Sequence, residues 1–419
     1  MNPFPLVLAT LRRNRFTAIL FVTVIALAVA LGIAISAQER ALRLGSARAA
    51  DRFDLIVAAP GSQNDVLFSV VYLDPTAVEL LSPEMTAAVL NGGRADFAAP
   101  IGFGDNFNGD PVVGTSAEFV DHLSRGLAEG RLFTRLDEAV VGALSPNRVG
   151  DRLAIRHGHA DGLSGNDADA AADAHEAGED HVEAEEEPGH SHVDVAVVGR
   201  MKPTGTPWDR AVVVPVEYNW FAHGMGTGHL PGETRIGAPY EAAPGVPAIV
   251  IKPENLAAAY GLRNRYRTTE STAFFPAEVL VEIYAVMGNV ARIMSGLTLA
   301  AQVLVVAAIL AGILALLDLQ RQRFAVLRAL GAPGSFVFAV VWLYVGTLIA
   351  GGALIGLPLG WGVAAIVSRL VARETGVAMT AQIGIAELAL VGALLCVGFL
   401  LALVPALLTY RKPVVEALR

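Results

Sequence analysis

The chain has 419 residues, of which 53% are hydrophobic, and its mean hydropathy is +0.50. A wholly soluble chain rarely reaches this value, so the composition indicates a membrane protein. The net charge of −9 arises in one segment, residues 157–192, which holds eleven acidic residues and no Lys or Arg. The rest of the chain has no broad basic patch, which argues against nucleic acid as a partner. The single cysteine, Cys396, excludes a disulfide framework.

Four apolar stretches are long enough to cross a bilayer, because about 20 apolar residues in helical form span its hydrocarbon core. They predict an α-helical membrane protein with four transmembrane helices plus a mixed α/β extracytoplasmic domain. The predicted segments, in chain order, are a cytoplasmic N-terminal segment (1–15), transmembrane helix 1 (16–37), the extracytoplasmic domain (38–275), a stalk that continues into transmembrane helix 2 (276–317), a cytoplasmic loop (318–335), transmembrane helix 3 (336–369), an external loop (370–384), transmembrane helix 4 (385–408) and a cytoplasmic tail (409–419).

The first apolar stretch could also be read as a cleaved signal peptide, because small residues lie at its end. Its apolar core is longer than the 7–15 residues of a typical signal, which favours an uncleaved anchor. Basic residues precede the first stretch and follow the second and the fourth, and cytoplasmic flanks carry an excess of Lys and Arg. Both termini and the 318–335 loop are therefore expected in the cytoplasm, although Arg369 and Arg373 lie on the opposite side.

The extracytoplasmic domain is expected to mix strands and helices. Short apolar runs rich in Val and Ile predict strands, at 55–59, 139–143, 193–199 and 211–216. Two segments predict helices: Ser82–Leu90, with a capping Ser and a Pro at the first helical position, and Pro253–Tyr260, which begins with Pro and continues into an Ala run. The flanks 151–156 and 193–199 predict a hairpin from which residues 157–192 extend.

This insertion is rich in histidine and acidic residues and poor in large apolar ones, so it is predicted to be disordered without a ligand. Neutral imidazole suits zinc, copper and nickel, and carboxylates can complete such a site. Zinc or another transition metal is therefore the candidate ligand, and a solvated acidic loop is the alternative. The candidate metal ligands are His157, His159, His175, His181, His190 and His192. A second cluster with a weaker signal contains His223, Met225 and His229, for which ordinary loop histidines are the alternative.

The third apolar stretch contains Gly352, Gly356 and Gly360 at four-residue spacing. Small residues on one helix face allow close helix–helix packing in lipid. The pattern fits packing within one subunit and a dimer seam equally well. Near residue 276 an amphipathic pattern leads into the second stretch and predicts a stalk helix that enters the membrane without a break; the alternative is a separate surface helix with a hinge at Gly288 or Gly296.

The chain lacks the G-x-x-x-x-G-K-[ST] loop that cradles nucleotide phosphates, as well as the H-E-x-x-H and G-x-S-x-G motifs. We therefore expect no intrinsic enzyme activity and no intrinsic cofactor. If ATP drives this protein, a separate polypeptide must bind and hydrolyse it.

The cytoplasmic loop reads RQRFAVLRALGAPGSFV (321–337) and the C-terminus reads VPALLTYRKPVVEALR (404–419). Both resemble the FtsX/MacB family of ABC transporter permeases, which includes the lipoprotein-releasing Lol permeases. The resemblance implies a short coupling helix that docks on a partner ATPase, and Gly331 with Pro333 is expected to end it. A basic loop at the lipid headgroups is the alternative. The expected coupling residues are Arg321, Arg323, Phe324, Val326, Leu327, Arg328, Leu330 and Gly331, with Arg323 standing where the family often has Glu.

The resemblance further implies a MacB-like periplasmic domain, a bacterial inner-membrane location and two ATPase subunits bound to a permease dimer. This dimer is expected to be a homodimer, and a heterodimer with a similar permease is the alternative. It implies mechanical transmission of ATP-driven motion from the cytoplasm to the external domain. Three functions remain open: a permease linked to zinc or other metal handling with a periplasmic metal-binding protein, a lipoprotein-release or small-molecule efflux permease with an incidental His-rich loop, and a non-transporting regulator of a cell-wall hydrolase.

Overall fold

A computed structural model describes residues 2–157, 194–286 and 331–403, apart from residues 75, 77 and 234, together with single positions at 288, 296, 303, 307 and 326. The chain divides into two compact units. A helical unit comprises Met1–Leu44, Tyr284–Ala372 and Met379–Arg419, and an α/β unit comprises Gly45–Ile283 and Arg373–Ala378.

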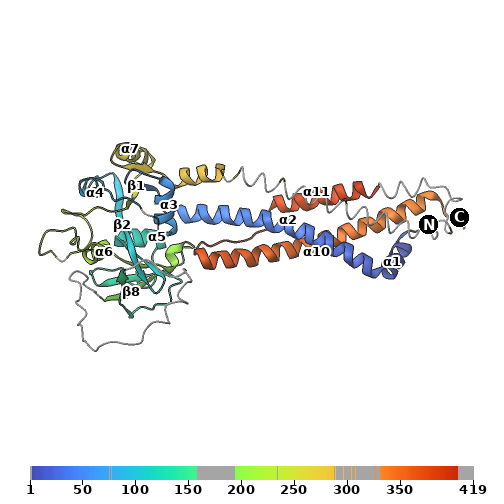
Figure 1. Cartoon of the computed structure of the whole chain (residues 1–419), viewed down its shortest axis with the longest axis horizontal. Coiled ribbons are helices and arrows are strands. Elements are labelled where there is room, and N and C mark those ends of the chain that lie inside the picture. The colour runs from blue at the N-terminus through green and yellow to red at the C-terminus, as the bar shows by residue number, and fades with distance from the viewer. Residues whose placement is uncertain are drawn as a thin grey trace, which may run out of the picture. The chain divides into compact units, whose positions relative to one another are not determined.

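The described helices of the helical unit are α1 (Phe4–Arg13), α2 (Arg15–Ala50), α10 (Gly334–Thr375) and α11 (Ile385–Leu401). In Figure 1, α2, α10 and α11 run side by side, and one apolar core joins them. Its fully buried members include Val29 and Ile33 of α2 and Val345 of α10. Large apolar side chains also cover the outer faces, such as Phe16 and Leu354, which are 84% and 78% exposed. Exposed side chains of this kind are expected to face lipid.

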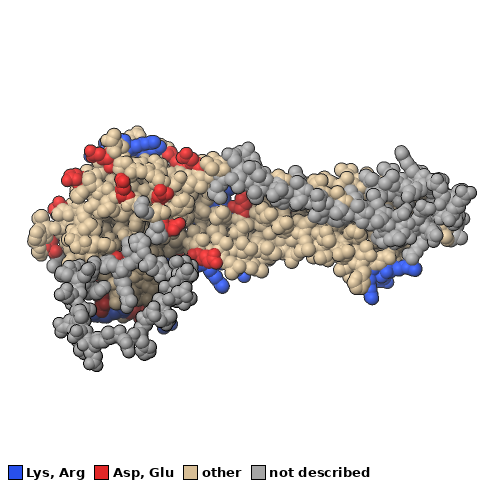
Figure 2. All heavy atoms as spheres, viewed as in Figure 1, with Lys and Arg blue, Asp and Glu red and all other residues tan. Residues whose placement is uncertain are grey.

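Two of the described helices are long and apolar enough to cross a membrane, α2 and α10. The apolar helix α11 has 17 residues in the part of the chain that the structure describes. Most of residues 287–330 are not among the described residues. The predicted count of four membrane spans therefore stays a prediction. Figure 2 shows a long uncharged surface on the described helical unit, with basic side chains at the end next to α1. This distribution fits the charge-free sequence between Arg15 and Glu39.

The α/β unit is built around one sheet with the order β11-β1-β10-β2-β3-β9-β5-β8-β4, while β6 pairs with β8 and β7 with β2. Most neighbours are antiparallel, but β3 runs parallel to β9 and β5 runs parallel to β8. The strands are β1 (Leu55–Ala58), β2 (Ala95–Phe107), β3 (Asp110–Thr115), β4 (Leu127–Gly130), β5 (Glu138–Val141), β6 (Arg152–Leu153), β7 (Arg156–His157), β8 (Val195–Met201), β9 (Val212–Pro215), β10 (Ala248–Pro253) and β11 (Thr272–Phe274).

The helices of this unit are α3 (Gln63–Tyr72), α4 (Pro83–Leu90), α5 (Ala117–Ser124), the 3₁₀ turn η1 (Pro207–Arg210), α6 (Val216–Ala222) and α7 (Leu256–Tyr266). Figure 1 shows α4 and α7 near β1, toward one end of the sheet, with β8 toward the other. Each end has its own apolar core. One core contains Trp220 and Tyr240 beside β1 and β10, and the other contains Val197 and Val212 around β5, β8 and β9.

The mixed α/β character predicted from the sequence is confirmed, with strands in all four apolar runs. The cap of α4 is also confirmed, because Ser82 accepts a hydrogen bond from the amide of Met85 and Pro83 is the first helical residue. The helix predicted at Pro253–Tyr260 begins later than expected. Pro253 ends strand β10, and α7 begins at Leu256 with Asn255 as its cap.

The hairpin predicted around the insertion forms only in part. On its N-terminal side, β6 pairs with β8 in antiparallel register, Arg152 opposite Ala196. The residues nearest the insertion, Arg156 and His157, instead form β7 and pair with β2.

The last residues of α10 and the three residues that follow it, together 373–378, belong to the α/β unit. The amide of Ala378 donates a hydrogen bond to the carbonyl of Gly205, 2.9 Å away. Gly376 has a left-handed φ of 71° and packs so closely on Pro207 that a Cβ would lie 2.8 Å from its Cα. Glycine is therefore required there both by backbone conformation and by space.

Candidate functional site

Most of the predicted coupling residues, and all insertion histidines after His157, lie outside the described residues. Val326 is described and is 50% exposed. Gly331 has a left-handed φ of 95°. Pro333 follows two residues later, immediately before the start of α10. A left-handed glycine is the usual residue just past a helix end. His157 forms the end of β7, with Asp105 of β2 opposite it in the register.

The three glycines of α10 face α2. A Cβ at Gly352 would lie 2.5 Å from the Ile25 Cβ, and one at Gly356 would lie 2.7 Å from the Val29 Cβ. At Gly360 it would lie 2.6 Å from the Ala30 carbonyl oxygen. Ordinary contacts are 3.4 Å or more, so only glycine permits this approach of the two backbones. We refer to these three contacts as the glycine seam, and in this chain the seam lies between two helices of one subunit.

A buried polar cluster links two helices of the helical unit, α2 and α11. The carboxylate of Glu387, at the start of α11, is fully buried and forms an ion pair with Arg40 of α2 at 2.8 Å. It also accepts hydrogen bonds from the Ser36 hydroxyl at 2.8 Å and the Gly384 amide at 2.7 Å. Its partners satisfy the charge, as burial of a carboxylate requires. This cluster could not be predicted from the sequence, because Arg40 and Glu387 are separated by most of the chain and neither belongs to a recognisable motif.

In the α/β unit, a second buried cluster forms in the loop between α6 and β10. The His229 side chain has no exposed surface, and neither ring nitrogen has a hydrogen-bond partner among the described residues. Its Nε2 lies 3.5 Å from the Oε1 of Glu217, and its Nδ1 lies 3.6 Å from the Oε2 of Glu241. The imidazole stacks on Tyr240, with ring centroids 5.2 Å apart. We call His229, Glu217, Glu233 and Glu241 the His229 cluster.

The aromatic and glycine packing around this histidine fixes its position. Trp220 meets Tyr240 edge-on, with centroids 5.4 Å apart. Gly228 has a left-handed φ of 73°, and a Cβ there would lie 2.5 Å from the Trp220 ring. A larger residue before His229 would therefore push the loop away from the indole. Burial also raises the pKa of Tyr240 well above its usual value.

The carboxylates of the cluster differ in exposure. The Glu217 side chain is 2% exposed and accepts a hydrogen bond from the Gly237 amide. The Glu233 and Glu241 side chains are 39% and 37% exposed and share one cation, Arg235, at 3.0 and 2.6 Å. Hydrogen bonds from Arg235 hold the pKa of Glu241 below its usual range. Ligand atoms of His229, Glu233 and Glu241 all lie within 4.8 Å of one another.

The weaker histidine cluster predicted from the sequence is not brought together. The Nδ1 of His223 lies 2.7 Å from the carbonyl oxygen of Asn219, and its Nε2 lies 3.8 Å from Asp105. Met225 is 41% exposed. His229 is surrounded instead by Glu217 of α6 and by Glu233 and Glu241 of the loop that follows it. The glycine-rich loop, with acidic residues after His229, was the one signal for this arrangement in the sequence, but spacing alone could not select the partners.

Comparison with known proteins supports the membrane part of the prediction. Residues 295–414 match the family described as FtsX-like permease C-terminal. The periplasmic region of MacB from Actinobacillus actinomycetemcomitans is a solved structure with similarity to 57% of this chain and 95% of its own length, at 10% identity and a TM-score of 0.32. No curated protein matches this chain. The resemblance to FtsX-like permeases is thus confirmed for residues 295–414, which match the FtsX-like permease C-terminal family.

Proposed function

We propose that this chain is the membrane subunit of an ABC transporter of the FtsX/MacB/Lol type. A separate ATPase, present as two copies bound to a permease homodimer, hydrolyses ATP in the cytoplasm. The permease transmits the resulting motion to its α/β unit on the outer side of the bacterial inner membrane. Membership of residues 295–414 in the FtsX-like permease C-terminal family is the observation that carries this proposal, because permeases of this family work with ABC ATPase partners.

The helices of the glycine seam support a mechanical role. Helix α2 has 36 residues and helix α10 has 42. The last residues of each helix belong to the α/β unit, and the rest belong to the helical unit. A helix resists bending except where a Pro can kink it, as Pro358 can in α10, and close backbone packing on both sides of Pro358 joins α10 to α2 in one stiff element. The Glu387 cluster adds α11 to the same element.

The coupling segment is the part to test first. Replacing Leu327 by Asp puts a charge among the apolar residues expected to enter a groove on the ATPase, which should abolish coupling. The permease would be co-purified with the ABC ATPase encoded beside it, placed in lipid nanodiscs, and its stimulation of ATP hydrolysis measured. Leu327→Asp is expected to lose that stimulation.

A matched control uses the same substitution at Leu144, which lies in the α/β unit and is 65% exposed. Leu144→Asp is expected to stimulate hydrolysis like the wild type. Stimulation by Leu327→Asp at the wild-type level would overturn the docking proposal. Reporter fusions at residues 200 and 328 should place these positions in opposite compartments, and a shared compartment would overturn the topology.

Metal handling is a second candidate function, which the composition of residues 157–192 favours. Deleting that segment should weaken zinc binding by the purified chain while leaving ATPase coupling intact. Unchanged zinc titration after the deletion would remove this role from the insertion. Lipoprotein release, efflux or control of a hydrolase would then be separated by identifying the periplasmic partner that co-purifies with the chain.

A further inference from the structure

The buried imidazole of His229 requires an explanation. Most buried polar atoms form hydrogen bonds, and leaving one without a partner costs about 1–3 kcal/mol. Both ring nitrogens of His229 lack a partner among the described residues, although carboxylate oxygens face both of them. The gaps of 3.5 and 3.6 Å are longer than the 2.7–3.2 Å of a good hydrogen bond.

The distances suit a coordinated metal ion. Two ligand atoms, each about 2.1 Å from a tetrahedral ion, lie about 3.4 Å from each other. The separation of 3.6 Å between the Nδ1 of His229 and the Oε2 of Glu241 is close to this value. Glu233 supplies a third ligand atom within the same 4.8 Å group. One nitrogen and two carboxylate oxygens leave a position for water on a first-row divalent ion.

The other side of the imidazole resembles the support of a metal ligand. A ligating histidine almost always donates its second ring N–H to a carboxylate or carbonyl, which fixes the ring and its tautomer. Glu217 stands at that side, with its Oε1 3.5 Å from Nε2. This carboxylate is itself buried and held by the Gly237 amide. Tyr240 stacks on the ring and prevents it from turning.

We propose that the His229 cluster binds a divalent transition-metal ion, with zinc as the best match, through the Nδ1 of His229 and the carboxylates of Glu233 and Glu241. Glu217 acts as a positioning residue that accepts a hydrogen bond from the Nε2–H of His229. This site is separate from the histidine-rich insertion, and it does not depend on the proposed function.

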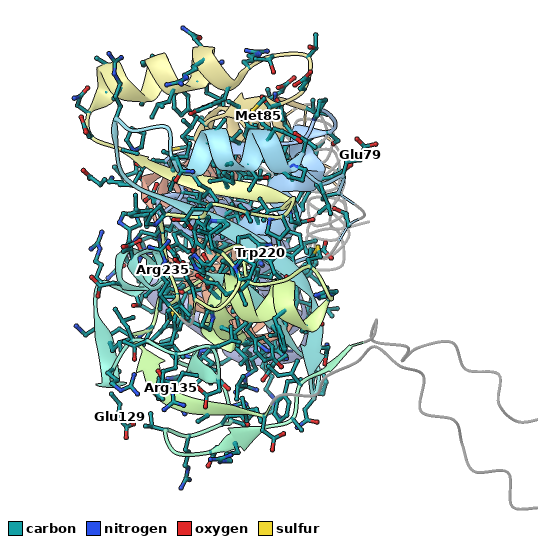
Figure 3. The ribbon with its side chains drawn as sticks, turned by 90° about the vertical axis from the view of Figure 1, so that its left-hand side faces the viewer. Glu79, Met85, Glu129, Arg135, Trp220 and Arg235 are labelled. Atoms are coloured by element: carbon teal, nitrogen blue, oxygen red, sulfur yellow. The ribbon has the colours of Figure 1, made fainter. Side chains whose placement is uncertain are left out.

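The effect of Arg235 on zinc affinity distinguishes this proposal from a purely structural cluster. Its guanidinium now neutralises Glu233 and Glu241, at 3.0 and 2.6 Å. A metal ion must compete with that positive charge for the same oxygens. Figure 3 labels Arg235 and Trp220 near the middle of the face that it shows, whereas Glu129 and Arg135 lie toward its lower end. With 40% of its side chain exposed, Arg235 can move into solvent when an ion binds.

The test uses the full chain in detergent, with the insertion histidines replaced by asparagine so that only the His229 cluster remains to be titrated. Zinc chloride is titrated by calorimetry, and cobalt(II) is added as a spectroscopic probe of the ligand set. One zinc per chain is expected to bind. Glu241→Gln should weaken binding by about tenfold or more, and Glu217→Gln by about 10–100-fold. Arg235→Gln should tighten binding, because it removes the competing cation.

His223→Ala is the matched control, since this histidine follows the same helix but lies beside Asn219 and Asp105. It should bind zinc like the parent chain. His229→Ala should remove binding, and if it fails to fold, the half-exposed positions 235 and 241 still decide the outcome. Absence of zinc binding by the parent chain, unchanged affinity in Glu241→Gln, or weaker affinity in Arg235→Gln would each overturn the proposal.

Discussion

The glycine seam predicts a sharp difference between two glycines of the same helix. Gly356 lies against α2, whereas a Cβ at Gly362 would meet no atom within 4 Å. Alanine at 356 would place its Cβ 2.7 Å from both the Val29 Cβ and the Ala26 carbonyl oxygen. The two helices must then separate locally, since an ordinary contact begins at 3.4 Å. We expect Gly356→Ala to destabilise the helical unit and Gly362→Ala to leave it unharmed.

The magnitude follows from the required displacement. Relief of the contact takes about 0.7 Å, and a gap of 0.5–1 Å forfeits about a quarter to a half of the dispersion energy across it. Overpacking of a close-packed site typically costs about 1–3 kcal/mol. Alanine gains about 1 kcal/mol over glycine in helix propensity, but it does so at both positions. The difference between the two variants therefore isolates the seam and should be about 2 kcal/mol.

Both variants would be purified in mixed micelles and unfolded with increasing SDS, with helix content followed by far-UV circular dichroism. The midpoint of Gly356→Ala should fall well below that of Gly362→Ala. ATPase stimulation by the two variants should show the same order if the paired helices transmit motion. Equal midpoints for the two variants would refute the close contact of α2 and α10.

Two further predictions concern the α/β unit. Hydrogen bonds from Arg131 lower the pKa of Glu138 from its usual 4.5 to about 2; the stabilisation is therefore present above about pH 4.5 and is lost as the pH falls toward 2. Glu138→Gln should cost about 2 kcal/mol of unfolding free energy at neutral pH, after allowance for solvent screening at the half-exposed Arg131. The difference between variant and wild type in the free energy of urea unfolding should shrink between pH 5 and 3. A difference that does not depend on pH would contradict this. At Gly142 a Cβ would collide with the backbone of Asp209. Gly142→Ala should therefore destabilise the unit by about 3 kcal/mol in urea unfolding followed by tryptophan fluorescence, whereas Gly61→Ala, where a Cβ would enter open space, should not. Equal unfolding midpoints for these two variants would count against the packing at η1.

The sequence predicted those elements whose signals are local. Ser82 followed by Pro83 specifies a helix start within four residues, and the structure places the cap there. The prediction that a helix begins at Pro253 was wrong, because proline also suits the end of a strand, where its nitrogen need not donate a hydrogen bond to the neighbouring strand. Pairing of β10 with β1 and β2 determines the outcome, and those partners lie far away in the chain.

Long-range partners limited the prediction of the sites as well. The spacing of the three α10 glycines indicated a packing face, but nothing in that segment identified α2 as the helix it meets. The His229 cluster shows the same limit on a smaller scale. Its histidine belonged to a recognised local group, but burial and aromatic stacking selected glutamates as neighbours in place of His223 and Met225.

The return of residues 373–378 to the α/β unit has a practical and a mechanical consequence. A fragment spanning 45–283 would omit the peptide that covers Gly205 and Pro207, so crystallisation trials on such a piece would begin with an incomplete domain. The polypeptide also crosses the boundary between the units at four points, near residues 44, 283, 372 and 378. A domain connected to the rest of the chain at several points can be tilted or pulled as a whole, whereas a domain connected at one point would rotate freely about it.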